Sequence, residues 1–177
     1  MNVCLIGDGL ISLTLAKTLI NKKIKVYMYY ENNRKIPNDN RTIGISSDNL
    51  DFIQKKIVKI NKNLIWEINK IEIYNDLNTK EKILNFQQSN KRLFSIIKNN
   101  DLYKLLINSL KKNNKFKKIK IKNKTFYSKI LNNQKFDLVI NCDGSNEIST
   151  RYFYQKIIKD YVSTAYATII NHNKINN

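Results

Sequence analysis

A glycine turn near the start of the chain has the residue types and spacing that bind phosphate groups. It follows the pattern Gly-x-Gly-x-x-Ser, with Gly7, Gly9 and Ser12 at the fixed positions. Gly7 allows a sharp reversal of the chain, and Gly9 lets the backbone approach a pyrophosphate closely. The N–H groups that begin the following helix carry a partial positive charge and face such a ligand. The pattern predicts a dinucleotide site, and the alternative is a tight turn without a ligand.

The residues around this turn predict the βαβ unit that positions it. Residues 3–6 are an apolar run typical of a buried strand, and residues 12–19 carry apolar side chains at helical spacing. A second strand is expected over residues 25–30. Ser12 stands where such turns normally have a third glycine, and its small side chain should still let the helix pack near the strand.

Two acidic residues bear on this prediction in opposite ways. Asp8 lies between the two glycines, where a carboxylate that points inward would repel a phosphate. An acid at the end of the second strand usually binds a ribose hydroxyl, and Glu31 is the candidate. Glu31 lies one place later than expected, in a Glu-Asn-Asn loop, so the alternative is a solvated loop residue.

A second motif combines an apolar strand with Asp and Gly. Residues 136–142 lead directly into Asp143 and Gly144. Ligands of open α/β sheets bind at the carboxyl ends of the strands, so Asp143 and Gly144 should lie at the same crevice as Gly7 and Gly9. The alternative is a plain Asp-Gly turn.

The segment after the second expected strand carries one more candidate. Arg41 begins a short extended piece that ends in two serines, and Ser47 or Asp48 can cap the helix expected over residues 50–60. An Arg in this place can hold a phosphate or hydroxyl of a cofactor. The alternative is an ordinary surface Arg.

From Trp66 onward the pattern becomes that of antiparallel strands. Trp66 itself is interpreted as core or domain-interface packing rather than a substrate platform. A hairpin inserted between βα units usually marks a second, mainly antiparallel domain, and such a hairpin is expected around the turn at residues 75–78. A helix is expected over residues 99–110, and further strands over 93–97, 116–121, 126–131 and 161–170.

The composition limits the classes of function. The chain has 177 residues and a formal net charge of +18, enough for one domain or one domain and part of another. Four of its 32 basic residues are Arg, and Lys is spread along the chain with many Asn and Ile residues, as an A/T-rich coding sequence favours. Because base readout and bidentate phosphate contacts favour Arg, we expect no nucleic-acid partner; residues 111–124 are the densest basic cluster.

The sequence also lacks the signals of membrane-spanning, secreted and zinc-binding proteins. There is no apolar run of 18 residues, and the expected first strand leaves no room for a signal peptide. Cys4 and Cys142 are interpreted as buried free thiols in a reducing, cytoplasmic compartment, and His172 as exposed and not catalytic. No zinc-like spacing, Gly-x-Ser-x-Gly turn or P-loop occurs, so no metal site is expected.

The order and spacing of four motifs resemble the flavin-dependent aromatic hydroxylases, in particular the ubiquinone-biosynthesis branch that acts on polyprenylated phenols. These motifs extend over nearly the whole chain, at residues 7–16, 41–46, 136–146 and 160–165. The resemblance implies an α/β fold with a Rossmann-like FAD-binding domain whose parallel sheet begins with the βαβ unit. It assigns residues 1–65 and 92–160 to that domain, and residues 66–91 and 161–177 to part of an antiparallel substrate domain.

The resemblance also implies the ligands. It implies FAD as the cofactor, NAD(P)H as the reductant, and a polyprenylated phenol and O2 as the substrates. The cofactor carries the chemistry, so the resemblance names no catalytic residue. A polyprenylated substrate implies contact of a cytoplasmic enzyme with the inner membrane face or with a biosynthetic complex. The implied cofactor-binding residues are Gly7, Gly9, Ser12, Glu31, Arg41, Asp143 and Gly144.

Three departures from the family pattern limit what can be carried over. Tyr30 stands where the family has its ribose-binding acid. Glu147 stands where the family usually has a Ser, and Arg151 comes one residue later than the Arg of the family pattern. The sequence ends at Asn177, before the family's later Gly-Asp-Ala-Ala-His stretch. We therefore expect this portion alone to bind FAD weakly and to hydroxylate nothing. The alternatives are a Rossmann protein that binds only NAD(P), and a basic nucleic-acid-binding module whose affinity falls steeply with salt.

Overall fold

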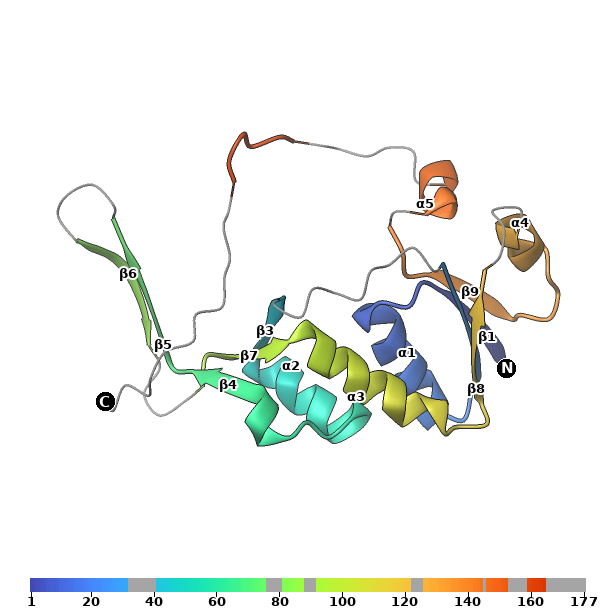
Figure 1. Cartoon of the computed structure of the whole chain (residues 1–177), viewed down its shortest axis with the longest axis horizontal. Helices are drawn as coiled ribbons and strands as arrows, with labels where there is room; N and C mark the ends of the chain where they lie inside the picture. The colour runs from blue at the N-terminus through green and yellow to red at the C-terminus, as the bar shows by residue number, and fades with distance from the viewer. Residues whose placement is uncertain are drawn as a thin grey trace.

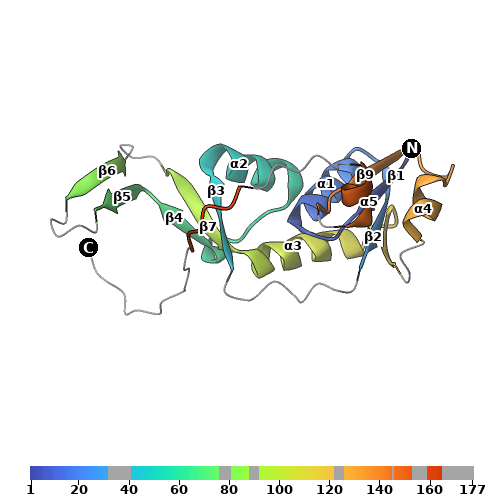
Figure 2. The same ribbon diagram turned by 90° about the horizontal axis from the view of Figure 1, so that it is seen from above.

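The computed structural model describes residues 1–31, 41–75, 81–87, 92–121, 126–144, 146–152 and 159–164. Its strands form a four-stranded sheet in the order β8-β2-β1-β9, a three-stranded sheet in the order β3-β7-β4, and a two-stranded sheet of β5 and β6. Figures 1 and 2 both show the β5–β6 pair projecting away from helix α1 and the four-stranded sheet.

The four-stranded sheet is parallel throughout. It comprises β1 (Asn2–Ile6), β2 (Lys25–Tyr30), β8 (Phe116–Lys120) and β9 (Leu138–Asn141). Helix α1 (Leu10–Asn21) connects β1 to β2, so the predicted βαβ unit is confirmed. A strand covered on both faces is apolar throughout, as residues 3–6 are in β1.

The two faces of this sheet bury separate clusters, because neighbouring side chains of a strand point to opposite faces. Val3 and Leu5 pack with α1 and with α3 (Asn99–Lys111). Cys4 and Ile6 face the other way, toward α4 (Phe126–Leu131) and α5 (Glu147–Tyr152). The second cluster contains Cys4, Ile6, Tyr29, Ile121, Tyr127, Ile130 and Ile148.

The three-stranded sheet is antiparallel and lies beside helix α2. It comprises β3 (Thr42–Ser46), β7 (Phe94–Lys98) and β4 (Ile65–Ile68). Helix α2 (Ser47–Phe52) continues into a π-helical turn, η1 (Ile53–Ile57), and a 3-10 turn, η2 (Lys62–Leu64), precedes β4. The predicted cap of α2 is wrong: Ser46 is the N-cap residue without a side-chain bond, while the Ser47 hydroxyl donates to the carbonyl of Arg92 at 2.5 Å.

The predicted hairpin is present as β5 (Lys70–Tyr74) and β6 (Lys82–Gln87). Ile71 lies opposite Phe86 and Ile73 opposite Leu84, so four apolar residues share one face. Trp66, on the preceding strand β4, is 50% exposed, so it is not a core residue, and its packing at a domain interface stays a prediction. β4 pairs with β7 across the expected domain boundary at residue 66, and the domain division itself stays a prediction.

Two strand predictions are wrong where the structure describes them. Residues 126–131 form helix α4, because Tyr127 and Ile130, three residues apart, are both buried against the sheet. Residues 161–164 form no strand, and Val162 has a positive φ of 51°. Residues 165–170 of that expected strand, and His172, lie outside the described residues. Cys4 is buried as expected, whereas Cys142 is only half-buried.

Candidate functional site

The glycine turn and the Asp143 corner lie against each other at the carboxyl edge of the parallel sheet. β1 pairs with β9, with Ile6 opposite Asn141, so Gly7 and Asp143 follow neighbouring strand ends. Gly7 has φ +106°, and a Cβ built on it would lie 3.2 Å from the Cβ of Asp143 and 3.4 Å from the carbonyl carbon of Cys142. The structure thus brings together the two motifs expected at one crevice, and Gly7 is required on both conformational and steric grounds.

Ser12 acts on the turn through a hydrogen bond as well as by its small size. Its side chain is fully buried, and its hydroxyl donates to the carbonyl oxygen of Gly7 at 2.7 Å. The Gly7 N–H in turn donates to the carbonyl of Tyr29 at 2.8 Å, which ties the turn to strand β2. These two bonds fix the path of the chain between β1 and α1.

The start of α1 is free of side-chain capping. Gly9 is the N-cap residue in an extended conformation, and its carbonyl accepts the first helical bond from the Leu13 N–H at 3.0 Å. No side chain caps this end, and the first turn contains no acidic residue. The N–H groups of the first turn have no acceptor within the helix, so they are suited to an anionic ligand such as a diphosphate.

Asp8, whose carboxylate would repel a phosphate if it pointed inward, is paired with a cation. Its Oδ2 lies 3.0 Å from the Nζ of Lys118, a residue of β8 that sequence reasoning did not single out. Lys118 also donates to the hydroxyl of Tyr103 at 3.1 Å and lies 4.2 Å from the ring centre of Tyr30. The acid between the two glycines therefore has a built-in counter-charge.

Glu31 is held by helix α4. The hydroxyl of Tyr127 donates to Oε1 of Glu31, and the Tyr127 side chain is buried while Glu31 is exposed. Burial and this hydrogen bond raise the pKa of Tyr127 above its ordinary value. Glu31 is thus tied to α4 by a hydrogen bond while it stays exposed just after β2, and its role toward a ribose stays a prediction. The sequence gives no signal for this role of Tyr127, because it predicts a strand over residues 126–131.

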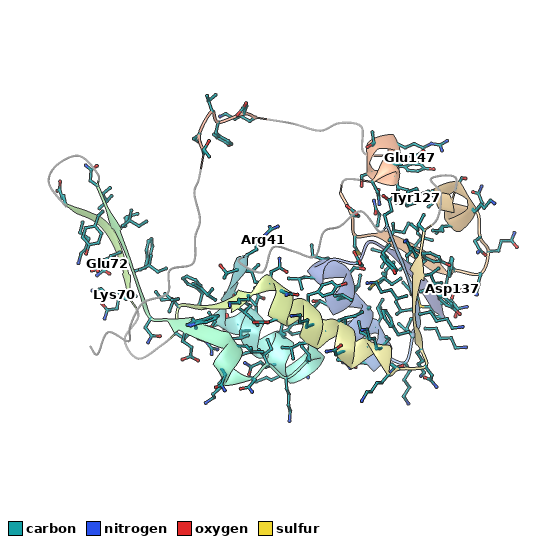
Figure 3. All side chains as sticks on the ribbon, viewed as in Figure 1. Arg41, Lys70, Glu72, Tyr127, Asp137 and Glu147 are labelled. Atoms are coloured by element: carbon teal, nitrogen blue, oxygen red, sulfur yellow. The ribbon has the colours of Figure 1, made fainter. Side chains whose placement is uncertain are left out.

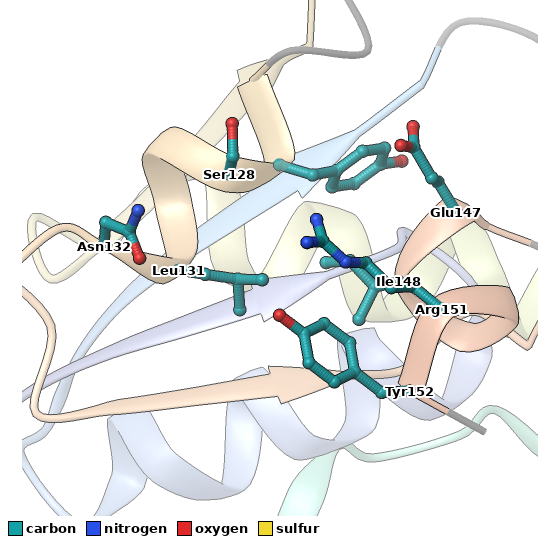
Figure 4. A pocket seen from close by; sticks show the side chains of 8 residues that line it. Ser128, Leu131, Asn132, Glu147, Ile148, Arg151 and Tyr152 are labelled. Carbon is teal, nitrogen blue, oxygen red and sulfur yellow. The ribbon is translucent and has the colours of Figure 1, made fainter.

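A cavity of about 490 Å³ opens between α4 and α5, beside the Glu31–Tyr127 contact. Figure 4 shows the side chains of Arg151 and Tyr152 projecting into it from α5. The guanidinium carbon of Arg151 lies 5.8 Å from the ring centre of Tyr152. The lining residues are Tyr127, Ser128, Leu131, Asn132, Glu147, Ile148, Arg151 and Tyr152.

Arg41 lies apart from these residues. It is exposed at the start of β3, and its carbonyl accepts from the N–H of Asn99 at 2.8 Å. Figure 3 shows it well away from Tyr127 and Glu147. An extended ligand is needed to reach from the end of β2 to Arg41. Gly144 has open space around its Cα, with nothing within 4 Å of a built Cβ.

The described residues contain no group of His, Cys, Asp and Glu side chains arranged to hold a metal ion. Within the same residues, no helix has the length and apolar character needed to cross a membrane.

Comparison with known proteins identifies the class of fold. No family model matches the sequence, and no curated protein matches it. A solved structure described as an FAD-containing monooxygenase, from Photorhabdus luminescens, has 18% identity and a TM-score of 0.61, over 88% of this chain and 43% of that chain. PqsL of Pseudomonas aeruginosa, described as an FAD-dependent monooxygenase, has 16% identity and a TM-score of 0.54, over 68% of this chain and 32% of that chain.

A third solved structure, 2-methyl-3-hydroxypyridine-5-carboxylic acid oxygenase, has 14% identity and a TM-score of 0.50, over 60% of this chain and 28% of that chain. At such identities the likeness concerns the fold. The chain has the mixed α/β fold of FAD-dependent monooxygenases, as predicted, and spans between 28% and 43% of the length of these three proteins. The resemblance to flavin-dependent hydroxylases is confirmed at this level.

Proposed function

We propose that this chain is the FAD-binding portion of a flavin-dependent monooxygenase that hydroxylates an aromatic ring. The observation that carries the proposal is the junction of Gly7 with Asp143 at one sheet edge, next to a helix start that no side chain caps. An uncapped helix N-terminus behind a glycine turn binds a diphosphate through its N–H groups. The fold shared with FAD-dependent monooxygenases supports the same cofactor.

In this proposal the adenosine half of FAD lies toward β2. The amides that follow Gly9 bind the diphosphate, and Ser12 keeps the turn in shape through the carbonyl of Gly7. Glu31 accepts a ribose hydroxyl, with Tyr127 holding its carboxylate at the end of the strand. The chain's own residues thus bind and orient this half of the cofactor.

The flavin half extends in the opposite direction. Asp143 and Gly144 border the diphosphate from the side of β9, and Gly144 leaves room for a close approach. Arg41, which Figure 3 shows distant from Tyr127 and Glu147, is the residue we assign to the linker of the flavin ring. When bound, FAD supplies the redox chemistry with oxygen.

We further propose NAD(P)H as the reductant, O2 as the co-substrate, and a polyprenylated phenol of ubiquinone biosynthesis as the compound hydroxylated. The four sequence motifs support this choice, and so does one protein of the same fold whose name gives a hydroxypyridine, an aromatic ring, as its substrate. Because the chain spans under half of each of the three structures compared above, we expect the isolated chain to bind FAD without forming hydroxylated product.

We also propose that the protein contacts an anionic membrane surface, where a polyprenylated substrate is available. The net charge of +18 supports this contact, as does the half-exposed apolar face of the β5–β6 hairpin, on which Ile73, Leu84 and Phe86 are 43%, 48% and 49% exposed. Basic and apolar groups together bind anionic lipid surfaces.

Titration of the purified chain with FAD, followed by flavin fluorescence, tests the cofactor proposal. We expect saturable binding with a Kd on the order of 10 µM, since part of the cofactor stays unenclosed. ADP should compete because it carries the diphosphate and adenosine, and riboflavin should not. Uptake of NAD(P) without FAD would favour the nicotinamide-only alternative, and no uptake of any dinucleotide would contradict both.

A further inference from the structure

The acid in the glycine turn poses an electrostatic problem for the proposed diphosphate site. Asp8 lies between Gly7 and Gly9, beside the helix start whose free N–H groups attract anions. A bare carboxylate at this place cancels part of that attraction and repels a diphosphate directly. A protein that binds a dinucleotide here must neutralise Asp8 or turn it away.

Lys118 is placed to do both. Its Nζ lies 3.0 Å from Oδ2 of Asp8, and both side chains are largely buried, with 24% of Lys118 and 14% of Asp8 exposed. The contact spans the sheet, because Lys118 is on β8 and Asp8 follows β1, with β2 between them. An ion pair between two largely buried side chains that are anchored in one sheet keeps its geometry better than an exposed surface ion pair does.

Two tyrosines from other elements hold the ammonium group in place. Tyr103 of α3 accepts a hydrogen bond from Nζ at 3.1 Å, and the ring centre of Tyr30, at the end of β2, lies 4.2 Å away. Burial alone lowers the pKa of Lys118, but the hydrogen bonds with Tyr103 and Asp8 outweigh burial and keep the pKa above its ordinary value. Lys118 therefore stays charged at neutral pH.

We propose that Lys118 is a positioning residue for the dinucleotide: it fixes the Asp8 carboxylate against β8 and cancels its charge, so that a diphosphate can bind at the Gly7–Gly9 turn. The proposal rests on the proposed function, since it assumes a diphosphate ligand. It makes the acid between the glycines compatible with the site, and it assigns the site a residue 110 positions further along the chain than Asp8.

A double-mutant cycle on Asp8 and Lys118 in the full chain tests the proposal, with ADP and adenosine as probes. Lys118→Met should lower the affinity for ADP about tenfold, because Asp8 is then an uncompensated charge beside the diphosphate. Adenosine, which lacks phosphate, should bind Lys118→Met as it binds the wild type. The double variant Asp8→Asn/Lys118→Met should regain most of the ADP affinity, and Lys118→Arg should retain it.

Lys117→Met is the matched control. Lys117 is an exposed neighbour on the same strand, on the opposite face, and its loss removes the same charge without touching Asp8. ADP affinity should stay within about twofold of the wild type. Asp8→Asn alone gives a second test that does not remove Lys118. The affinity for ADP should rise, and it should fall more steeply with salt, because the charge of Lys118 is then no longer balanced by Asp8.

The outcomes separate the two proposals. If the wild type binds neither ADP nor FAD, the proposed function fails and this role fails with it. If the wild type binds ADP but Lys118→Met binds it equally well, only the positioning role fails. Equal losses for ADP and adenosine, with no rescue by Asp8→Asn, would assign Lys118 a purely structural role and overturn the proposal, as would an Asp8→Asn variant with weakened ADP binding.

Discussion

The Cα of Gly7 faces Asp143 so closely that a methyl group does not fit between them without a shift. A Cβ on Gly7 would lie 3.2 Å from the Cβ of Asp143. The backbone of Gly7 has φ +106°, a value that residues other than glycine rarely adopt. We expect Gly7→Ala to lower the free energy of unfolding by about 1–3 kcal/mol through backbone strain. Urea unfolding followed by circular dichroism measures this change.

Gly144→Ala is the control for that experiment. Gly144 belongs to the same corner of the sheet, but nothing lies within 4 Å of its built Cβ. Its substitution should change the free energy of unfolding by less than about 0.5 kcal/mol. Equal effects of the two substitutions would show that the close approach of Gly7 to Asp143 does not decide the choice of glycine.

The uncapped start of α1 predicts opposite effects of one substitution on stability and on binding. Gly9→Asp places a carboxylate at the N-cap position, where it can accept hydrogen bonds from the first-turn N–H groups. The thermal midpoint should stay equal or rise, while FAD affinity falls at least about tenfold, because the carboxylate occupies and repels the diphosphate position. Gly9→Ala, which cannot cap, should retain more FAD affinity than Gly9→Asp. The opposite order would place the diphosphate elsewhere.

The sequence predicted those parts of the site whose structure depends on residues close together along the chain. The β1–turn–α1–β2 unit is local, so the apolar periodicity and the glycine spacing were sufficient to place Gly7, Gly9 and Ser12. The Asp143 corner was also placed correctly beside the turn, because parallel strands in such sheets share their carboxyl edge.

The partners of the acidic residues could not be predicted in this way. Lys118 reaches Asp8 only because β8 pairs with β2, and one Lys among many has no distinguishing sequence signal. Helix α4 was missed because residues 126–131 are rich in aromatic and β-branched side chains, which favour a strand locally. Burial of Tyr127 and Ile130 against the sheet overrides that preference, and with the helix the Glu31 contact was missed too.

The Tyr127–Glu31 hydrogen bond predicts a moderate loss of stability on substitution. Tyr127→Phe removes the hydroxyl but keeps the buried ring, so the free energy of unfolding should fall by about 1–2 kcal/mol. Glu31 keeps its charge in this variant, so FAD binding should weaken less than in Glu31→Gln, which removes the proposed ribose acceptor charge. Denaturant unfolding and FAD titration of both variants measure these effects. Normal FAD affinity in Glu31→Gln would contradict the ribose assignment.

The two free thiols should react at different rates. Cys4 on β1 is fully buried, and burial raises the pKa of its thiol to about 12. Cys142 is half-buried and less protected. A thiol reagent at pH 8 should therefore modify Cys142 in the native protein and Cys4 only after unfolding, which mass spectrometry of the labelled peptides detects. Rapid labelling of Cys4 in the native protein would contradict the burial of β1.

Cys4 also predicts a pH dependence of stability. The pKa of its thiol lies above the reference value of 9.0 in the folded chain, so folding favours the neutral thiol. The stabilisation is fully present below about pH 9 and is lost as the pH rises toward 12. Urea unfolding at several pH values should show a steeper alkaline loss for the wild type than for Cys4→Ala. Parallel curves for the two proteins would contradict this linkage.

The β5–β6 hairpin predicts an effect on membrane binding without an effect on the parallel sheet. In the described residues its strands pair only with each other, and the half-exposed Leu84 and Phe86 lie on its apolar face. Leu84→Ser/Phe86→Ser should change the urea midpoint of the main unfolding transition little, because neither residue contributes to the two core clusters. The same variant should bind anionic phosphatidylserine vesicles several-fold more weakly in a flotation assay, since apolar insertion adds to the electrostatic attraction.

Asn85→Ser, on the other face of β6, is the matched control and should bind vesicles like the wild type. Unchanged binding by the double variant would mean that the basic surface alone holds the lipid, and no binding by the wild type would remove the proposed membrane contact.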